Sequence, residues 1–270
     1  MSQLDKLKQI FNKMQRVVIG YSGGIDSTLL AYLATKKLGE NAVSILLISK
    51  LTPADQIEDA IRTAQTLNLN LKTIEIDPLT SDDVCSNPPN RCYYCKKIMF
   101  GVICEEAKRL GIDTVIDGAN MDDMNEFRPG TRAIAELGVI SPYKELNIKK
   151  EEIRAIARSL DIPNWNKPSY ACLASRIPYG TEITTEILHK IDEAESVLSQ
   201  LGFRQFRVRH HGEIARIELV PIDMEKAITH TMRIHIVKEL KRIGYHYVTL
   251  DMVGYRTGSM NEILDTSLDF

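Results

Sequence analysis

Residues 16–28 read RVVIGYSGGIDST, and this stretch decides the fold. The first six residues have the apolar, β-branched composition of a buried strand. Two adjacent glycines follow, and the remaining residues open a helix predicted over 26–38, whose apolar residues recur at spacings of three and four. The stretch therefore predicts a strand that turns through a glycine loop into a helix.

The glycine loop has the chemistry of a phosphate site. Gly23 and Gly24 allow backbone conformations closed to other residues, so several amide groups converge on one anion. The helix N-terminus behind them adds a partial positive charge. Nucleotide contacts are predicted for Ser22, Gly23, Gly24, Asp26, Ser27 and Thr28, with Asp26 also holding Mg²⁺. The alternative is an ordinary glycine turn in which Ser27 or Asp26 caps the helix.

Strand and helix patterns alternate along the first part of the chain. The predicted strands are 16–21, 42–48, 71–76, 114–117 and 139–141, and the predicted helices are 26–38, 53–67, 96–110, 132–137 and 149–160. Such alternation predicts an α/β fold with a Rossmann-like parallel sheet covered on both faces. Ligands in these sheets bind beyond the carboxyl ends of the strands, where the glycine loop lies.

The pattern changes near residue 178. A helix is predicted over 184–201, strands over 206–211 and 214–220, a helix over 221–243 and a strand over 245–252. The sequence thus predicts domains at 1–178 and 179–270, the second a smaller antiparallel α+β domain for substrate binding and oligomerisation. We expect a homo-oligomer in which this domain packs against another copy.

Composition excludes several classes of protein. The net charge of −2 gives no global basic field, which argues against nucleic acid as the partner. No apolar run is long enough to span a membrane, and the charged N-terminus is not a secretory signal, so a cytoplasmic location is expected. The five cysteines are an odd number for a disulfide framework and favour metal binding or catalysis.

The residues SGGIDS at 22–27 match the SGGxDS signature of the PP-loop ATP pyrophosphatases, which cleave ATP between the α and β phosphates. The lysine of a Walker A loop is absent. The segments 117–120 (DGAN) and 141–146 (SPYKEL) resemble distal loops of the same superfamily. In the first loop the resemblance and the side-chain types suggest metal or ribose ligands at Asp117, Asn120, Asp122, Asp123 and Glu126.

Three further segments narrow the resemblance. They are PPNRCYYCKK at 88–97, WNKPSYACLASRIPYG at 165–180 and GYRTGSMNE at 254–262. Together with the phosphate loop they resemble, over essentially the whole chain, the ATP-dependent sulfur transferases of nickel-pincer nucleotide cofactor biosynthesis. The resemblance implies adenylation of a carboxylate of pyridinium-3,5-dicarboxylate mononucleotide, a small-molecule acceptor, and replacement of the activated oxygen by sulfur. Asp26 and Cys172 are then the catalytic residues.

The family contains two sulfur sources. Some members sacrifice one cysteine, at the position of Cys172, which becomes dehydroalanine. Others have two additional cysteines and are taken to hold a 4Fe-4S cluster. Because this chain has the additional pair, the resemblance implies Cys92, Cys95 and Cys172 as three cluster ligands, with one iron open for sulfide. Cys85 as a fourth ligand would close that iron.

The acceptor is strongly anionic. Arg207 and Arg209 alternate along a predicted strand and share one face, which suits paired contacts to an anion. Arg176 and Arg256 complete the predicted pocket, and the family likeness adds Glu195 and Asp223 as base or metal groups. The alternative for each arginine is a solvated face or a weak surface ion pair.

Two other functions compete with this interpretation. A tRNA thiolase of the same superfamily would be expected to have a more basic accessory domain. A nucleotide-binding module without catalysis would be expected to lack Asp26 or Cys172, and both are present.

Overall fold

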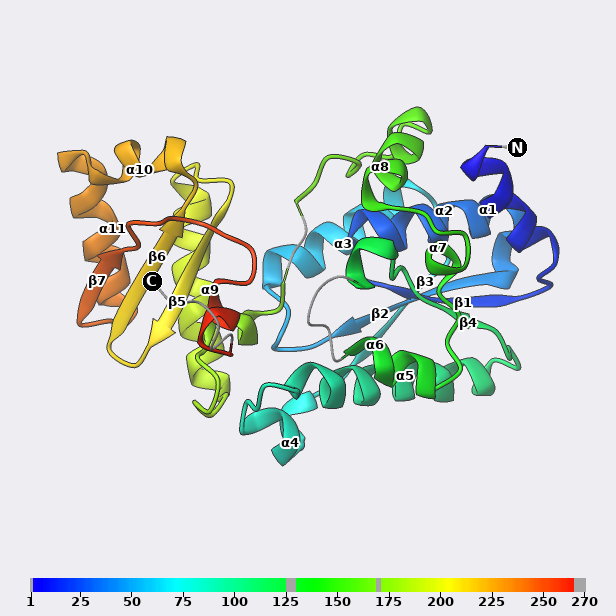
Figure 1. Cartoon of the computed structure of the whole chain (residues 1–270), viewed down its shortest axis with the longest axis horizontal. Helices are drawn as coiled ribbons and strands as arrows, with labels where there is room; N and C mark the ends of the chain where they lie inside the picture. Colours follow the sequence, from blue (N-terminus) through cyan, green and yellow to red (C-terminus); the bar gives the residue numbers. More distant parts are fainter. Residues whose placement is uncertain (1, 125–129, 169–170, 265–270) are drawn as a thin grey trace. The chain divides into compact units, whose positions relative to one another are not determined.

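The chain folds into two compact units, and the computed structural model describes residues 2–124, 130–168 and 171–264 (Figure 1). Unit 1 comprises residues 1–80 and 90–170, and unit 2 comprises residues 81–89 and 171–270. Among the described residues, no helix has both the length and the apolar character needed to cross a membrane.

A parallel four-stranded sheet forms the centre of unit 1. Its strands are β1 (Val17–Tyr21), β2 (Ala42–Ile48), β3 (Leu71–Glu75) and β4 (Val115–Ile116), in the order β3-β2-β1-β4. The predicted Rossmann-like parallel sheet is confirmed. The fifth strand, predicted over 139–141, is reduced to one bridge between Ile116 and Ile140. Only five residues separate the helices on either side of it, which leaves no room for a longer strand.

Helices cover both faces of this sheet (Figure 1). They are α1 (Gln3–Asn12), α2 (Ile25–Leu38), α3 (Ala54–Thr66), α5 (Arg91–Arg109), α6 (Gly130–Glu136), α7 (Pro142–Glu145) and α8 (Lys150–Ser159), with 3₁₀ turns at Gly39–Asn41, Pro78–Thr80 and Met121–Met124. Side chains of α2, α3 and α8 form one apolar cluster with Ile19 of β1. Side chains of α5 and α6 form the other with Val18. Alternate residues of β1 therefore serve opposite layers.

Helix α5 begins earlier than the sequence pattern predicts. The pattern places its start at residue 96, whereas the helix starts at Arg91, immediately after Asn90. The last proline of the preceding loop is Pro89, so no residue after it prevents a helix from starting. Cys92 and Cys95 consequently lie at the beginning of the helix.

Unit 2 contains a three-stranded sheet in the order β5-β6-β7. Its elements are α4 (Asp82–Cys85), a 3₁₀ turn at Leu173–Arg176, α9 (Thr185–Gln200), β5 (Phe206–His211), β6 (Ile214–Leu219), α10 (Pro221–Ile228), α11 (His230–Arg242), β7 (Tyr247–Leu250) and a 3₁₀ turn at Ser259–Leu264. The smaller α+β fold is confirmed. The expectation of an antiparallel sheet is wrong for β7, which pairs parallel to β6. The helical connection between these two strands is a crossover, which returns the chain in the same direction.

The predicted helix over 221–243 is broken at Thr229, whose backbone is extended (φ −56°, ψ 148°). Its hydroxyl donates to the Lys226 carbonyl at 2.9 Å, so this side chain competes with the helix for that acceptor. Two helices, α10 and α11, result.

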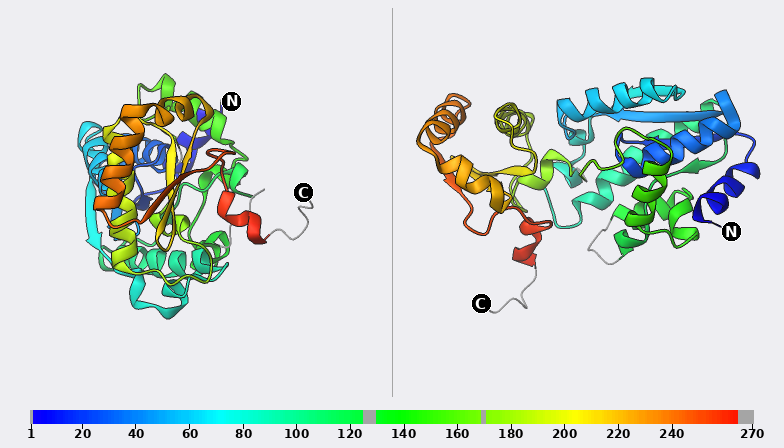
Figure 2. Two further views of the ribbon diagram at one scale, coloured as in Figure 1. Left: turned by 90° about the vertical axis from the view of Figure 1, so that its left-hand side faces the viewer. Right: turned by 90° about the horizontal axis from the view of Figure 1, so that it is seen from above.

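The two faces of the β5–β7 sheet differ. Helices α9 and α11 pack on one face, where Leu198, Val208 and Leu240 belong to an apolar cluster (Figure 2). The charged residues of β5 and β6, such as Arg207 and Glu218, alternate with this cluster and occupy the opposite face.

Residues 81–89 are bound to the segment that follows Cys172. Buried Asn87 donates from Nδ2 to the carbonyls of Ile177 (3.3 Å) and Pro178 (2.8 Å). The amide of Ile183 donates to the Cys85 carbonyl at 2.8 Å. The chain leading toward the CxxC pair and the chain leaving Cys172 are thus joined within unit 2.

Candidate active site

The phosphate loop connects β1 to α2 and depends on glycine. Gly23 has a φ of 72°, and a Cβ there would lie 2.4 Å from the Cβ of Ala60 in α3. Any side chain would therefore push the loop off α3 as well as strain its backbone.

Hydroxyl groups support the loop from inside. Ser27 Oγ accepts from the Ser22 amide at 3.1 Å and donates to the Gly24 carbonyl at 3.1 Å. Thr28 Oγ1 donates to the same carbonyl at 2.8 Å. Ser27 and Thr28 are buried, whereas Ser22 is exposed. In this structure the two buried hydroxyls shape the loop, and Ser22 is the one turned to solvent.

Asn164, which the sequence did not single out, holds the loop from behind. It is 7% exposed and donates from Nδ2 to the Gly23 carbonyl at 2.9 Å and to Thr28 Oγ1 at 3.1 Å. It comes from the segment after α8, more than a hundred residues along the chain. No local motif marks such a contact.

Asp26, the predicted Mg²⁺ ligand, lies in the first turn of α2 and is ion-paired with Lys150 at the start of α8. Asn120 Nδ2 lies 3.4 Å from its Oδ1, so the structure brings two predicted site residues together. Tyr143 donates to the Asp26 backbone carbonyl at 2.9 Å. Gly118 packs against the start of α2, where an added Cβ would lie only 3.0 Å from the Ser27 amide nitrogen. A glycine at this position therefore lets the segment after β4 lie close to the phosphate loop. Lys150 provides the positive charge beside Asp26 that a bound Mg²⁺ would otherwise supply.

The acidic residues predicted as ligands after β4 differ in their burial and in their hydrogen-bond partners. Asp117 is 5% exposed, and burial raises its pKa against the opposing effect of a 2.6 Å hydrogen bond from Ser141 Oγ. Asp122 accepts from the Lys150 amide at 2.7 Å and so caps α8. The side chain of Asp123 and the whole of Glu126 lie outside the described residues.

Two of the predicted cluster ligands share one helix turn in unit 1. Cys92 is exposed and Cys95 half-buried, three residues apart at the beginning of α5, so they are neighbours on its surface. Arg91 Nη2 lies 3.8 Å from Cys92 Sγ. Cys104, on the same helix, is half-buried and burial raises its pKa, as suits a packing residue.

Cys172 belongs to unit 2 and begins the 3₁₀ turn Leu173–Arg176. It is half-buried, and its carbonyl accepts from the Ser175 amide (3.0 Å) and Ser175 Oγ (2.8 Å). Within the described part of the chain, no group of three or more His, Cys, Asp or Glu residues is arranged to hold a metal ion.

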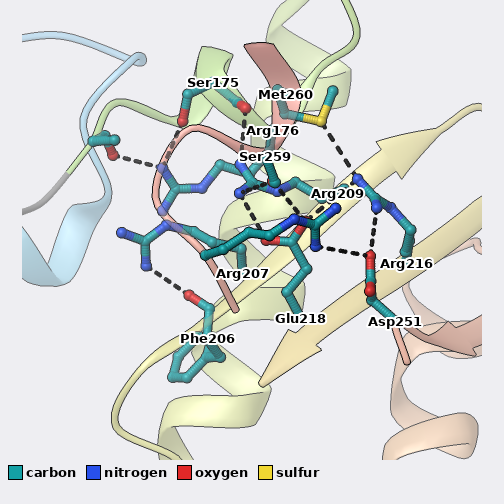
Figure 3. A network of polar contacts seen from close by, with 12 residues as sticks. Ser175, Arg176, Phe206, Arg207, Arg209, Arg216, Glu218, Asp251, Ser259 and Met260 are labelled. Atoms are coloured by element: carbon teal, nitrogen blue, oxygen red, sulfur yellow. Dashed lines mark hydrogen bonds and ion pairs between the residues drawn. The ribbon is translucent and has the colours of Figure 1, made fainter. Parts of the chain in front are cut away.

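The charged face of unit 2 is a network of buried arginines (Figure 3). Arg176, fully buried, makes two 2.9 Å hydrogen bonds to the Glu195 carboxylate. Arg209, 4% exposed, contacts Glu218 at 2.7 Å and the Ser175 carbonyl at 3.0 Å. These two predicted acceptor ligands have most of their donors satisfied within unit 2.

Arg256 and Asp223, which were also predicted to bind the acceptor, differ in their contacts. Arg256 is ion-paired with Glu262. Asp223 lies in the first turn of α10 and, within residues 171–264, forms no hydrogen bond or ion pair with Arg176, Arg207, Arg209 or Arg256.

Arg207 is the exception on this face. It forms no ion pair with an Asp or Glu among residues 171–264; Nη1 donates to the Phe206 carbonyl at 2.6 Å and the guanidinium lies 5.2 Å from the centre of the Tyr255 ring. Burial lowers the pKa of Arg207, and Arg176 nearby lowers it further. A partly desolvated guanidinium without a carboxylate is suited to bind an external anion.

Several known proteins have sequences similar to this chain. The NAD synthase family model matches residues 3–86, which include the phosphate loop. The chain is 36% identical to the pyridinium-3,5-bisthiocarboxylic acid mononucleotide synthase of Lactiplantibacillus plantarum, over 93% of this chain and 91% of that protein. It is 40% identical to an uncharacterised protein of Synechocystis, over 97% and 98% of the two chains. The NH₃-dependent NAD⁺ synthetase of Pyrococcus furiosus is 31% identical over 56% of this chain and 59% of its own.

Proposed function

Because this chain belongs to the family of the pyridinium-3,5-bisthiocarboxylic acid mononucleotide synthase, we propose that it transfers sulfur to carboxylates of pyridinium-3,5-dicarboxylate mononucleotide. It is an ATP-dependent enzyme that forms AMP and pyrophosphate. The observation that carries the proposal is that one chain, aligned over nearly its whole length, has both an intact phosphate loop with Asp26 and a half-buried Cys172 in an arginine-rich unit. The first site activates a carboxylate and the second handles sulfur.

The first half-reaction is adenylation. A carboxylate oxygen of the acceptor attacks the α phosphorus, a new P–O bond forms, and the bond to the β phosphate breaks as pyrophosphate leaves. Loop amides around Gly23 and Gly24 would bind the phosphates, and Asp26, which is ion-paired with Lys150, would be the residue that holds Mg²⁺ against them. In the second half-reaction sulfur attacks the acyl carbon, and AMP leaves with the former carboxylate oxygen.

Acceptor binding falls chiefly to Arg207. Its guanidinium has no carboxylate partner among residues 171–264 and is partly desolvated, both of which strengthen binding to a phosphate or carboxylate. Arg209 and Arg256 lie in the same network, and their ion pairs with Glu218 and Glu262 hold this surface in shape.

For the sulfur source we propose a 4Fe-4S cluster held by Cys92, Cys95 and Cys172. The donor set fits, since thiolates are the ligands of such clusters and two of the three already share one helix turn. When bound, the cluster would present one iron without a protein ligand to sulfide.

Anaerobic purification, an absorption spectrum and an iron count test this source. Cys92→Ser, Cys95→Ser and Cys172→Ser should each bleach a brown, oxygen-sensitive protein and stop sulfur transfer. Adenylation should persist, because the phosphate loop is unchanged. Cys104→Ser is the matched control and should leave both colour and transfer nearly as they were. Colourless anaerobic protein, with Cys92→Ser retaining full single-turnover transfer, would leave Cys172 as the sole, sacrificial donor.

A further inference from the structure

The carboxylate of Glu195 is already occupied. It is 8% exposed; Oε1 accepts from Arg176 Nε at 2.9 Å and from the Val208 amide at 3.0 Å, and Oε2 accepts from Arg176 Nη2 at 2.9 Å. A carboxylate offers about four acceptor positions, so most are taken. A general base needs an oxygen within reach of the proton it removes, and here the oxygens face the guanidinium and the sheet edge.

The other side of Arg176 faces the sulfur site. Its Nη1 donates to the carbonyls of Ala171 (2.6 Å) and Cys172 (3.0 Å) and lies 3.0 Å from Ser175 Oγ. The guanidinium therefore bridges the Glu195 carboxylate and the backbone at the proposed cysteine. Planar, fixed donors make arginine suited to such a bridge, and lysine cannot reproduce it.

The turn beginning at Cys172 is held at several points. The Cys172 carbonyl accepts from the Ser175 amide, Ser175 Oγ and Arg176, and the Ser175 carbonyl accepts from Arg209 Nη1 at 3.0 Å. Because the backbone sets where a side chain begins, these contacts restrict the direction of the Cys172 thiol. Misplacing a reacting group by about 1 Å can slow a reaction by about a hundredfold.

We infer that Glu195, acting through Arg176, holds the Cys172 turn in position for sulfur transfer, so that Glu195 is a positioning residue and not a general base. The inference rests on the proposed function for what Cys172 does. The bridge itself is a property of unit 2 and is testable without turnover.

The kinetic test compares Arg176→Lys and Glu195→Gln in the full-length enzyme. Both should lower sulfur transfer by about tenfold or more, as expected for loss of charged hydrogen bonds, while the pyrophosphate of the first turnover, which leaves before sulfur attacks, forms near the parent rate. The double variant should be no slower than the slower single variant, because the two residues act as one unit. Glu193→Gln, two residues away on α9 and partly exposed, is the matched control and should transfer sulfur normally.

The pH profile separates positioning from base catalysis. A positioning residue leaves the residual transfer of Glu195→Gln with the same pH profile as the parent enzyme. Loss of the acidic limb in Glu195→Gln, together with full transfer by Arg176→Lys, would overturn the inference.

Thiol reactivity tests the bridge without catalysis. Full-length protein freed of metal by a chelator is treated with iodoacetamide, and each cysteine is followed by mass spectrometry. Alkylation of Cys172 should rise severalfold in Arg176→Lys and in Ser175→Ala, with Cys92 as the internal reference. Ser175→Ala removes a hydroxyl without leaving a buried charge, so it avoids the risk of misfolding. Unchanged Cys172 alkylation in both variants would contradict the inference, whether or not the parent protein transfers sulfur.

Discussion

Arg176 Nη1 lies 3.0 Å from the carbonyl oxygen of Cys172, four residues before it in the chain. A fully buried guanidinium thus contacts the backbone of the half-buried cysteine. The contact gives the CLASR segment at 172–176 a physical role: its arginine turns back to hold its cysteine.

Asp26→Ala should abolish Mg²⁺-dependent formation of AMP and pyrophosphate while leaving the fold intact, because the side chain lies at the mouth of the loop. Asp113→Ala, at an exposed position of the same unit, is the matched control. Pyrophosphate release at the parent rate from Asp26→Ala would show that the phosphate loop is wrongly assigned.

Arg207→Ala should raise the KM for the dicarboxylate nucleotide about ten- to hundredfold, the usual effect of losing a charged hydrogen bond. The KM for ATP should not change, because the phosphate loop belongs to unit 1. Arg204→Ala removes the same charge from an exposed site nearby in the chain and should change neither constant. If acceptor affinity survives the loss of Arg207, the anion pocket lies elsewhere.

Gly23→Ala should destabilise the protein by about 2–4 kcal/mol, from the positive φ and from overlap with Ala60. Gly138 also has a positive φ, of 70°, but a Cβ added there would meet no atom within 4 Å, so Gly138→Ala isolates the backbone effect of about 1 kcal/mol. Urea unfolding of both variants measures the difference. Equal losses would mean that Ala60 does not constrain the loop.

Asp117→Asn should become more stable relative to the parent as pH rises from below 3.8 toward neutrality. Burial raises the folded-state pKa of Asp117 above its ordinary value of 3.8. The contribution of this carboxyl to the parent's free energy of unfolding is therefore greatest below pH 3.8 and is lost as pH rises through the folded-state pKa. Ser141→Ala should show the opposite difference, losing stability with rising pH, because its hydroxyl favours the charged form. Free energies of unfolding measured at several pH values test the direction of both changes. A stability difference between Asp117→Asn and the parent that does not vary with pH would contradict the raised pKa of Asp117.

Much of the fold was predictable because its signals are local. The strands 42–48 and 206–211 have the bounds expected from their apolar and alternating patterns. The direction of β7 and the break at Thr229 were not predictable, since the first depends on how a crossover packs and the second on one side chain competing with a helix.

From the sequence the candidate site residues could be proposed, whereas their contact partners could not. The motif identified Asp26, but its contact with Lys150 joins residues far apart in the sequence, and only the fold reveals it. Likewise Arg207 and Arg209 look equivalent on an alternating strand. Their difference arises because Nη2 of Arg209 contacts Glu218 and Ser259, whereas no carboxylate among residues 171–264 is paired with Arg207.

The central claim is ATP-driven sulfur transfer, and mass spectrometry of acceptor and protein from one anaerobic reaction with ATP, Mg²⁺ and sulfide tests it most directly. We expect the acceptor to exchange oxygen for sulfur over repeated turnovers, with one AMP and one pyrophosphate for each sulfur and with Cys172 unchanged in mass. Transfer that stops after one sulfur per chain, with loss of H₂S from Cys172, would keep the transferase and replace the cluster by the sacrificial route. AMP and pyrophosphate released without any sulfur in the acceptor would contradict the claim itself.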